Sequence, residues 1–171
     1  MAAIMQIHEM TASMAGINKT RSTIRFKLAD NTNVNYLDPI IRPTSGAIHS
    51  YSKQLRLYCS TAPDVQVSNL RAYTDGASNF GTGVSVAATN YSASCGDPHV
   101  WVDNNQTVIS ASTNLFTKTA GSPMDLDAVH TAAVTTTGYC GDILKLMLSI
   151  DTNAAPGLLR PETLTFAYDE T

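Results

Sequence analysis

The sequence predicts an all-β protein: an antiparallel β-sandwich of jelly-roll or immunoglobulin-like type, with a short N-terminal arm or helix. Apolar and polar residues alternate over several short runs, and turn residues separate these runs. Small polar side chains are frequent, with 21 Thr, 15 Ser and 11 Asn among 171 residues. Charged residues make up only 15% of the chain, too few for the solvent-facing sides of helices.

Composition also excludes several classes of function. A hydrophobic share of 43% is too high for a disordered chain, and a net charge of −3 argues against nucleic-acid binding by bulk attraction. No run approaches the roughly 18 apolar residues of a membrane-spanning helix. The first residues lack the basic start and long apolar run of a secretory signal. We therefore expect a protein that is assembled in the cytoplasm and does not bind membranes.

The first twenty residues follow a different pattern from the rest of the chain. Apolar side chains recur there every three or four residues, the spacing of one helical face, at Ile4, Ile7, Met10, Met14 and Ile17. This pattern fits a short amphipathic helix packed on the body, a mobile tail, or a docking arm that lies on a partner subunit. The sequence thus divides into an N-terminal arm, residues 1–20, and a β-sandwich domain, residues 21–171.

From residue 22 onward the period changes to two. Strands are predicted at residues 22–28, 51–60, 65–74, 84–89, 99–102, 107–116, 143–150 and 162–170, with a short return strand at 34–37. Residues 131–137 fit either a strand or a loop. Asn69 disturbs the alternation of its run, which predicts a bulge near Asn69 and Leu70. The inward positions predict a core that includes Phe26, Leu55, Leu57, Leu146, Leu148, Leu164 and Phe166.

The glycine-rich residues 76–83 are predicted to form a hairpin loop. A phosphate-binding loop would need a following Lys-Ser or Lys-Thr pair and a helix, and a strand pattern follows instead. The acidic pair Asp125 and Asp127 has no neighbouring acidic run to complete a calcium site, so we expect a solvated loop.

The three cysteines, Cys59, Cys95 and Cys140, cannot all pair within one chain, so free thiols are predicted. Cys59 falls at an inward strand position and is expected to be a core residue. Cys95 and His99 lie four residues apart, but a structural zinc site needs about four ligands, and no metal site is predicted.

No motif selects a catalytic residue. The serine elbow Gly-x-Ser-x-Gly is absent, and nothing singles out two of the 14 acidic residues as a glycosidase pair. The sequence therefore predicts a protein that is not an enzyme and needs no cofactor.

Three stretches carry a family resemblance: residues 50–57 (SYSKQLRL), residues 68–76 (SNLRAYTDG) with Gly81-Thr82-Gly83, and residues 138–146 (GYCGDILKL) leading to residues 161–170 (PETLTFAYDE). These short phrases, spread over residues 50–171, resemble small β-sandwich structural proteins of tailed bacteriophage virions, of the kind that decorate or cement capsids. The resemblance implies a homo-oligomer, commonly a trimer, seated on the virion where subunits of the major capsid protein meet.

The expected function is thus to bind the outer capsid surface and stabilise it. The stripe of Ile4, Ile7, Met10, Met14 and Ile17 would anchor the arm in a neighbour's groove. The alternative is a carbohydrate- or receptor-binding tail or fibre module, for which Trp101, Tyr91, Tyr58 and Phe80 are the candidate aromatic platforms. A baseplate or tail adaptor is compatible with the same sequence.

Overall fold

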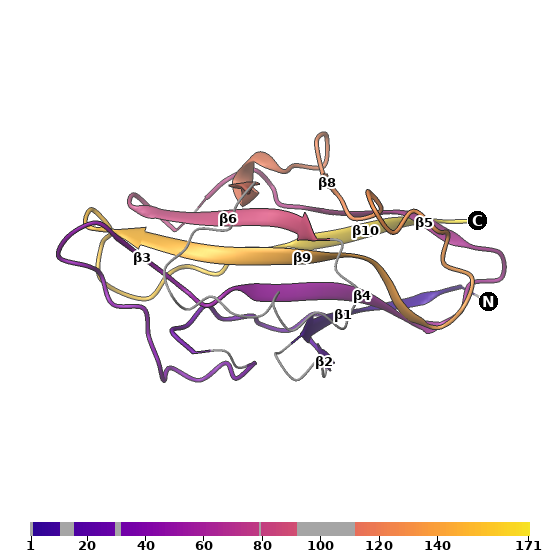
Figure 1. Ribbon diagram of the computed structural model, residues 1–171, viewed down its shortest axis with the longest axis horizontal. Coiled ribbons are helices and arrows are strands. Elements are labelled where there is room, and N and C mark those ends of the chain that lie inside the picture. Colours follow the sequence, from indigo (N-terminus) through magenta and orange to yellow (C-terminus); the bar gives the residue numbers. More distant parts are fainter. Residues whose placement is uncertain (1, 11–15, 30–31, 79, 92–111) are drawn as a thin grey trace.

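Figure 1 shows the computed structural model of the protein, which describes residues 2–10, 16–29, 32–78, 80–91 and 112–171. Its larger sheet has seven strands, all paired antiparallel. In spatial order they are β2 (Gly16–Asn18), β1 (Ile4–Met10), β4 (Lys53–Thr61), β9 (Gly138–Asp151), β6 (Val84–Tyr91) and β7 (Thr113–Asn114), with β3 (Ala47–His49) also paired to β9.

The second sheet has three strands, also antiparallel, in the order β10 (Thr165–Glu170), β5 (Val67–Tyr73) and β8 (Met124–Asp125). The one short helical turn in the described residues is η2, a 3-10 helix over Leu115–Thr117. The prediction of an all-β antiparallel sandwich is therefore confirmed. Both chain ends lie at the same end of the molecule (Figure 1), where the Ala3 N–H donates to Glu170 Oε1 over 2.6 Å.

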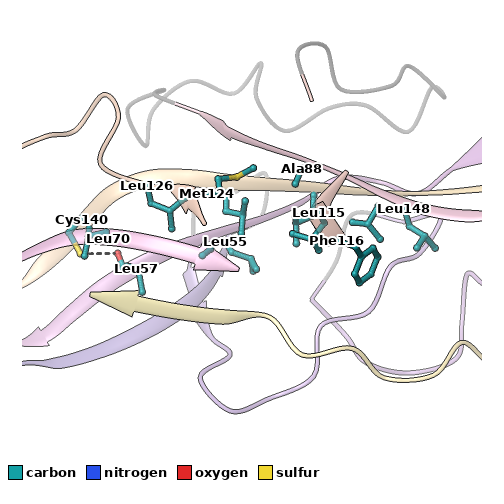
Figure 2. Packing of buried hydrophobic residues seen from close by; sticks show 14 of the residues in the cluster. Leu55, Leu57, Leu70, Ala88, Leu115, Phe116, Met124, Leu126, Cys140 and Leu148 are labelled. Atoms are coloured by element: carbon teal, nitrogen blue, oxygen red, sulfur yellow. Dashed lines mark hydrogen bonds between the residues drawn. The ribbon is translucent and has the colours of Figure 1, made fainter. Parts of the chain in front are cut away.

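The core lies between the two sheets. From the larger sheet, the inward side chains of Leu55, Leu57, Leu146 and Leu148 are at most 3% exposed, as their alternation predicts. The smaller sheet and η2 supply the opposing side chains, including those of Leu70, Leu115, Phe116, Met124 and Leu126 (Figure 2). Leu164, Phe166 and Phe26 pack against this core but are only partly buried. Burial of each large apolar side chain stabilises the fold by about 1.5–3 kcal/mol.

The predicted bulge at Asn69 is confirmed. Ser68 pairs with Asp169 and Arg71 with Ala167, so β5 has two residues where β10 has one. Asn69 adopts a positive φ of 55°, a conformation that asparagine tolerates better than most residues. The bulge turns the Leu70 N–H toward Asp127, whose Oδ2 accepts it over 2.7 Å.

A second bulge, which the sequence did not indicate, lies in β9. Leu55 pairs with Leu144 and Leu57 with Cys140, so three residues of β9 stand opposite Arg56 alone. Gly141 has a φ of 64°, and a Cβ there would lie 2.7 Å from Leu70 Cδ1. Only glycine combines this conformation with such close packing. The bulge turns the next residue, Asp142, inward, where its N–H donates to the Leu126 carbonyl over 2.6 Å.

Several predicted elements are wrong. Residues 22–28 and 34–37, both predicted as strands, are irregular. Lys27, a polar residue of the first run, is only 1% exposed, and its Nζ donates to Asn35 Oδ1. The chain is held there by tertiary contacts that alternation does not encode.

The glycine-rich residues 76–83 do not form a hairpin. They connect β5 in the smaller sheet to β6 in the larger one, so the segment crosses between sheets. Residues 131–137 are a loop, tied to the sheet at Val134, which exchanges both backbone hydrogen bonds with Val67. The strand predicted at residues 99–102, and most of that at 107–116, lie outside the described residues. Of the latter, Thr113–Asn114 is a strand and Leu115–Thr117 is the 3-10 turn.

Candidate interaction surface

The N-terminal residues form two paired strands, so of the alternatives for this segment the amphipathic helix is wrong. β1 pairs with β4 from Ile4 to Met10, and β2 folds back on the last part of β1. Within the described residues, the proposed arm is therefore part of the larger sheet. Apolar residues three apart lie on one face of a helix but on opposite faces of a strand. The spacing therefore also fits a strand that has apolar side chains on both of its faces.

Of the five expected docking residues, the four that the structure describes do not lie on one face. Ile4 and Ile17 are 54% and 44% exposed, whereas Met10 is buried and Ile7 packs partly against the core. Met14 lies outside the described residues. The four described residues form no continuous apolar stripe, and of these four only Ile4 and Ile17 are exposed.

A buried ion pair fixes the hairpin to the body. Lys53 Nζ lies 2.8 Å from Glu9 Oε1, with both side chains at most 3% exposed, and Lys19 Nζ lies 3.6 Å from Glu9 Oε2. Removing one partner of such a pair leaves an uncompensated buried charge, which is strongly destabilising. The geometry therefore opposes release of the hairpin as a free arm.

Three rings gather around β1 on the face of the larger sheet opposite to the Glu9–Lys53 ion pair. His8 stacks on Tyr58 with ring centroids 4.7 Å apart, and Tyr139 meets both rings edge-on at 5.6 and 5.1 Å. His8 Nδ1 lies 3.2 Å from the Tyr139 hydroxyl. Burial lowers the pKa of His8 below its usual value of 6.5, which favours the neutral imidazole.

The candidate aromatic platforms are not well placed for a sugar. One face of the Tyr58 ring is covered by His8, and Phe80 packs edge-on against the core residue Phe116 at 5.6 Å. Tyr91 is 37% exposed at the end of β6. Trp101 lies outside the described residues.

The most exposed group of large apolar side chains close in sequence lies instead in the loop of residues 32–42. Val34, Tyr36, Leu37 and Ile41 are 45%, 67%, 66% and 69% exposed, and we call these four side chains the apolar loop. Isolated exposed apolar residues are ordinary, but a group of this kind typically marks a protein-interaction site.

Polar contacts hold the apolar loop in position. The Arg25 guanidinium lies over the Tyr36 ring, 4.0 Å from its centroid, and Lys27 Nζ donates to Asn35 Oδ1. The Leu28 N–H donates to the carbonyl of Asp38, which has a positive φ of 57°. After the loop, Arg42 Nη1 donates to the Ala154 carbonyl over 3.3 Å.

These anchors order the backbone while the apolar side chains stay in solvent. A preorganised loop loses less conformational entropy on binding, which favours association. The sequence carries a signal for this surface, because its apolar residues lie among Asn, Asp and Pro, which disfavour strands. The return strand predicted at residues 34–37 is therefore wrong.

A buried carboxylate is the other feature that sequence reasoning missed. Asp142, fully buried at the β9 bulge, lies 2.8 Å from His130 Nδ1 and accepts the Val129 and His130 backbone N–H groups over 3.2 and 3.1 Å. Asn90 Nδ2 also donates to it, over 3.3 Å. These bonds fasten the loop after β8 to β9, so the carboxylate has a structural role.

Two thiols are placed by the structure, and both are buried and free. Burial raises the pKa of Cys140 to about 12 and also raises the pKa of Cys59. The assignment of Cys59 to the core is confirmed; Cys95 lies outside the described residues. In the described part of the chain, no three His, Cys, Asp or Glu side chains are grouped to hold a metal, and no helix is long and apolar enough to cross a bilayer.

Comparison with known proteins gives no relative from which to take a function. No protein-family model, curated protein or solved structure matches this chain. The structure itself defines an all-β antiparallel sandwich with an exposed, anchored apolar loop.

Proposed function

We propose that this chain is a structural protein of a tailed-phage virion that binds the outer surface of the capsid and stabilises it. Its partner is the major capsid protein, and its action needs neither a catalytic group nor a cofactor. The short sequence phrases in β4, β5, β9 and β10 support the class of protein.

The observation that carries the proposal is the apolar loop. Three of its side chains are about two-thirds exposed, yet the chain around them is anchored by Arg25, Lys27 and Arg42. Burying such side chains against a partner stabilises the complex by about 25 cal/mol for each Å² of apolar surface removed from water. On a repeated capsid lattice, several modest contacts of one oligomer combine into strong retention.

A binding experiment with matched variants tests this proposal. The triple variant Val34→Ser/Leu37→Ser/Ile41→Ser removes exposed apolar surface without touching the core or the contact between Arg25 and Tyr36. The control, Val65→Ser/Val129→Ser/Leu158→Ser, removes three side chains that are 64%, 58% and 77% exposed elsewhere. Each protein is sedimented with purified capsids that lack it, and the bound fraction is measured.

We expect the intact chain and the control to sediment with capsids and the loop variant to remain in the supernatant. Equal binding by all three proteins would exclude the apolar loop as the contact. Binding to tails or to glycans, with none to capsids, would support the alternative functions instead.

The N-terminal docking residues are tested separately. Deleting residues 1–17 would remove β1, which pairs along β4, and would damage the sheet itself. The variant Ile4→Ser/Ile17→Ser is the suitable change, because both side chains are exposed. Reduced capsid binding by this variant would support a docking role for the hairpin, and unchanged binding would exclude one.

A further inference from the structure

The strand β10 leaves one side of its backbone without partners. It lies at the edge of the smaller sheet, paired only with β5. Thr171, just beyond it, exchanges both backbone hydrogen bonds with Gln66, over 3.0 and 3.2 Å. Because backbone groups of alternate residues point to opposite sides of a strand, those of Phe166 and Tyr168 point away from β5. In the described part of the chain they form no backbone hydrogen bond on that side.

The other edge strands in the described residues are shorter. β2, β3, β7 and β8 have three, three, two and two residues, and β7 pairs with β6 at Ala87 and Ala88. The part of β1 beyond β2 is covered at Ile7, which accepts the Lys19 N–H and donates to the Thr20 hydroxyl. β10 has six residues and contains neither lysine nor proline, two residues that discourage pairing between edges, and its charged residues are the last two, Asp169 and Glu170.

We infer that β10 pairs antiparallel with β10 of a second copy of this chain, which joins two smaller sheets into one across a two-fold axis. Addition of a strand to a sheet edge draws its affinity from main-chain hydrogen bonds and its specificity from the alternating side chains. This pairing forms whether or not the chain binds a capsid. It predicts a two-fold dimer as the basic unit, where the sequence resemblance implies a trimer.

The sequence of β10 is complementary to itself in one register. With Phe166 opposite Tyr168 of the second copy, Ala167 lies on the two-fold axis and Thr165 lies opposite Asp169 of the second copy. The rings of Phe166 and Tyr168, which pack against the core, then become neighbours across the two strands. Aromatic pairs of this kind stabilise a strand pair. Asp169 is already paired with Arg71 at 2.8 Å, so its charge is compensated within each chain.

The neighbouring registers are less favourable. If the two-fold axis passes through Phe166 instead of Ala167, Glu162 lies opposite Glu170 of the second copy. If the axis passes through Tyr168, the two Asp169 side chains become diagonal neighbours and Leu164 has no residue opposite it. Like charges in such positions destabilise a strand pair.

Replacing Ala167 by a charged residue tests both the pairing of the two strands and its register. The backbone of Ala167 pairs with that of Arg71, and its side chain shares the outer face of the sheet with the Arg71–Asp169 ion pair. A charge there leaves the core intact. The variants Ala167→Lys and Ala167→Asp each place two like charges opposite each other across the axis, whereas an equal mixture allows opposite charges to meet. Ala133→Lys, in an exposed loop, is the control for added charge.

The mass of each protein is measured by light scattering over a range of concentrations, with circular dichroism to verify folding. We expect the intact chain and Ala133→Lys to reach twice 18.3 kDa. Each Ala167 variant alone should be a folded monomer, and the mixture should recover the dimer. A monomeric intact chain, or a dimer or trimer that neither Ala167 variant affects, would overturn the inference. A dimer strengthened by Ala167→Lys would overturn the register, because lysine would then face Asp169.

Discussion

Asn69 Nδ2 donates a hydrogen bond over 2.6 Å to Asp169 Oδ2, and the other oxygen of that carboxylate lies 2.8 Å from Arg71 Nη2. Asn69 is the bulged residue of β5, and Asp169 lies on the neighbouring strand β10. One carboxylate therefore links the bulged residue Asn69 to Arg71, the first residue after the bulge. Hydrogen bonding from Arg71 and then from Asn69 lowers the pKa of Asp169, which keeps it ionised over a wider pH range.

The conformation of Asn69 leads to a prediction about stability. Its positive φ costs most side chains about 1–2 kcal/mol, and glycine avoids that cost. Asn69→Ala should therefore lower the free energy of unfolding by about 1–2 kcal/mol, and Asn69→Gly should lower it less. Urea denaturation of the two variants measures the difference. Alanine as good as glycine at this position would contradict the bulge geometry.

The buried carboxylate of Asp142 should matter more than its histidine partner. Asp142→Ala leaves the backbone N–H groups of Val129 and His130 without their acceptor, and should cost about 3–5 kcal/mol. His130→Ala removes only a partly exposed ring and should cost about 1 kcal/mol. Both values come from chemical denaturation. Equal losses would show that the side-chain contact between His130 and Asp142, and not the backbone contacts, dominates.

Acid should weaken the fold through His8. Burial lowers its pKa in the folded chain below the usual 6.5, so the unfolded chain binds a proton more readily. The contribution of His8 to stability is present above pH 6.5 and is lost as the pH falls from there through the folded pKa. The urea midpoint of the intact chain should fall between pH 8 and pH 5, and less so for His8→Gln. Identical pH profiles would rule out this role, because His49 and His130 are common to both proteins.

The two core thiols should resist alkylation. Burial raises the pKa of Cys140 to about 12, so almost no thiolate is present at pH 8, and Cys59 is fully buried beside it in the sheet. Treatment with iodoacetamide at pH 8, followed by peptide mass spectrometry, should label neither residue in the native protein and both in urea. Rapid native labelling of Cys140 would contradict the packing in Figure 2.

Close packing requires glycine at position 16. A Cβ there would collide with the Tyr139 hydroxyl and would lie 2.8 Å from His8 Nδ1. Gly16→Ala should therefore displace the ring cluster and destabilise the protein by about 1–3 kcal/mol. Gly121→Ala, where a Cβ meets nothing within 4 Å, should change stability by less than about 0.5 kcal/mol. Equal effects of the two changes, measured in urea, would contradict the contact.

Local pattern was sufficient for the strands whose side chains alternate between core and solvent. The runs around Leu55, Leu70, Leu146 and Phe166 become β4, β5, β9 and β10, and even the bulge at Asn69 is visible as a break in alternation. Each of these strands has one face on the core, which its apolar residues mark. The other face of β4 is also buried, with Gln54 and Arg56 at most 7% exposed, and alternation does not indicate this.

Alternation fails where long-range contacts decide the conformation. Ile4, Ile7 and Met10 have helical spacing, but β4 offers an edge that pairs all seven residues of β1. Residues 22–28 alternate like a strand, yet Lys27 turns inward to Asn35 and no strand forms. The apolar loop was missed for the same reason. Its position depends on Arg25, Lys27 and Arg42, whose partners cannot be read from spacing.

Electron cryomicroscopy of capsids with and without the added protein is the most direct test of the proposed function. The account predicts additional density on the outer capsid surface, repeated with the lattice, with the apolar loop of Tyr36, Leu37 and Ile41 at the contact with the major capsid protein. Capsids that look the same with and without the protein, or density confined to the tail or the capsid interior, would contradict it.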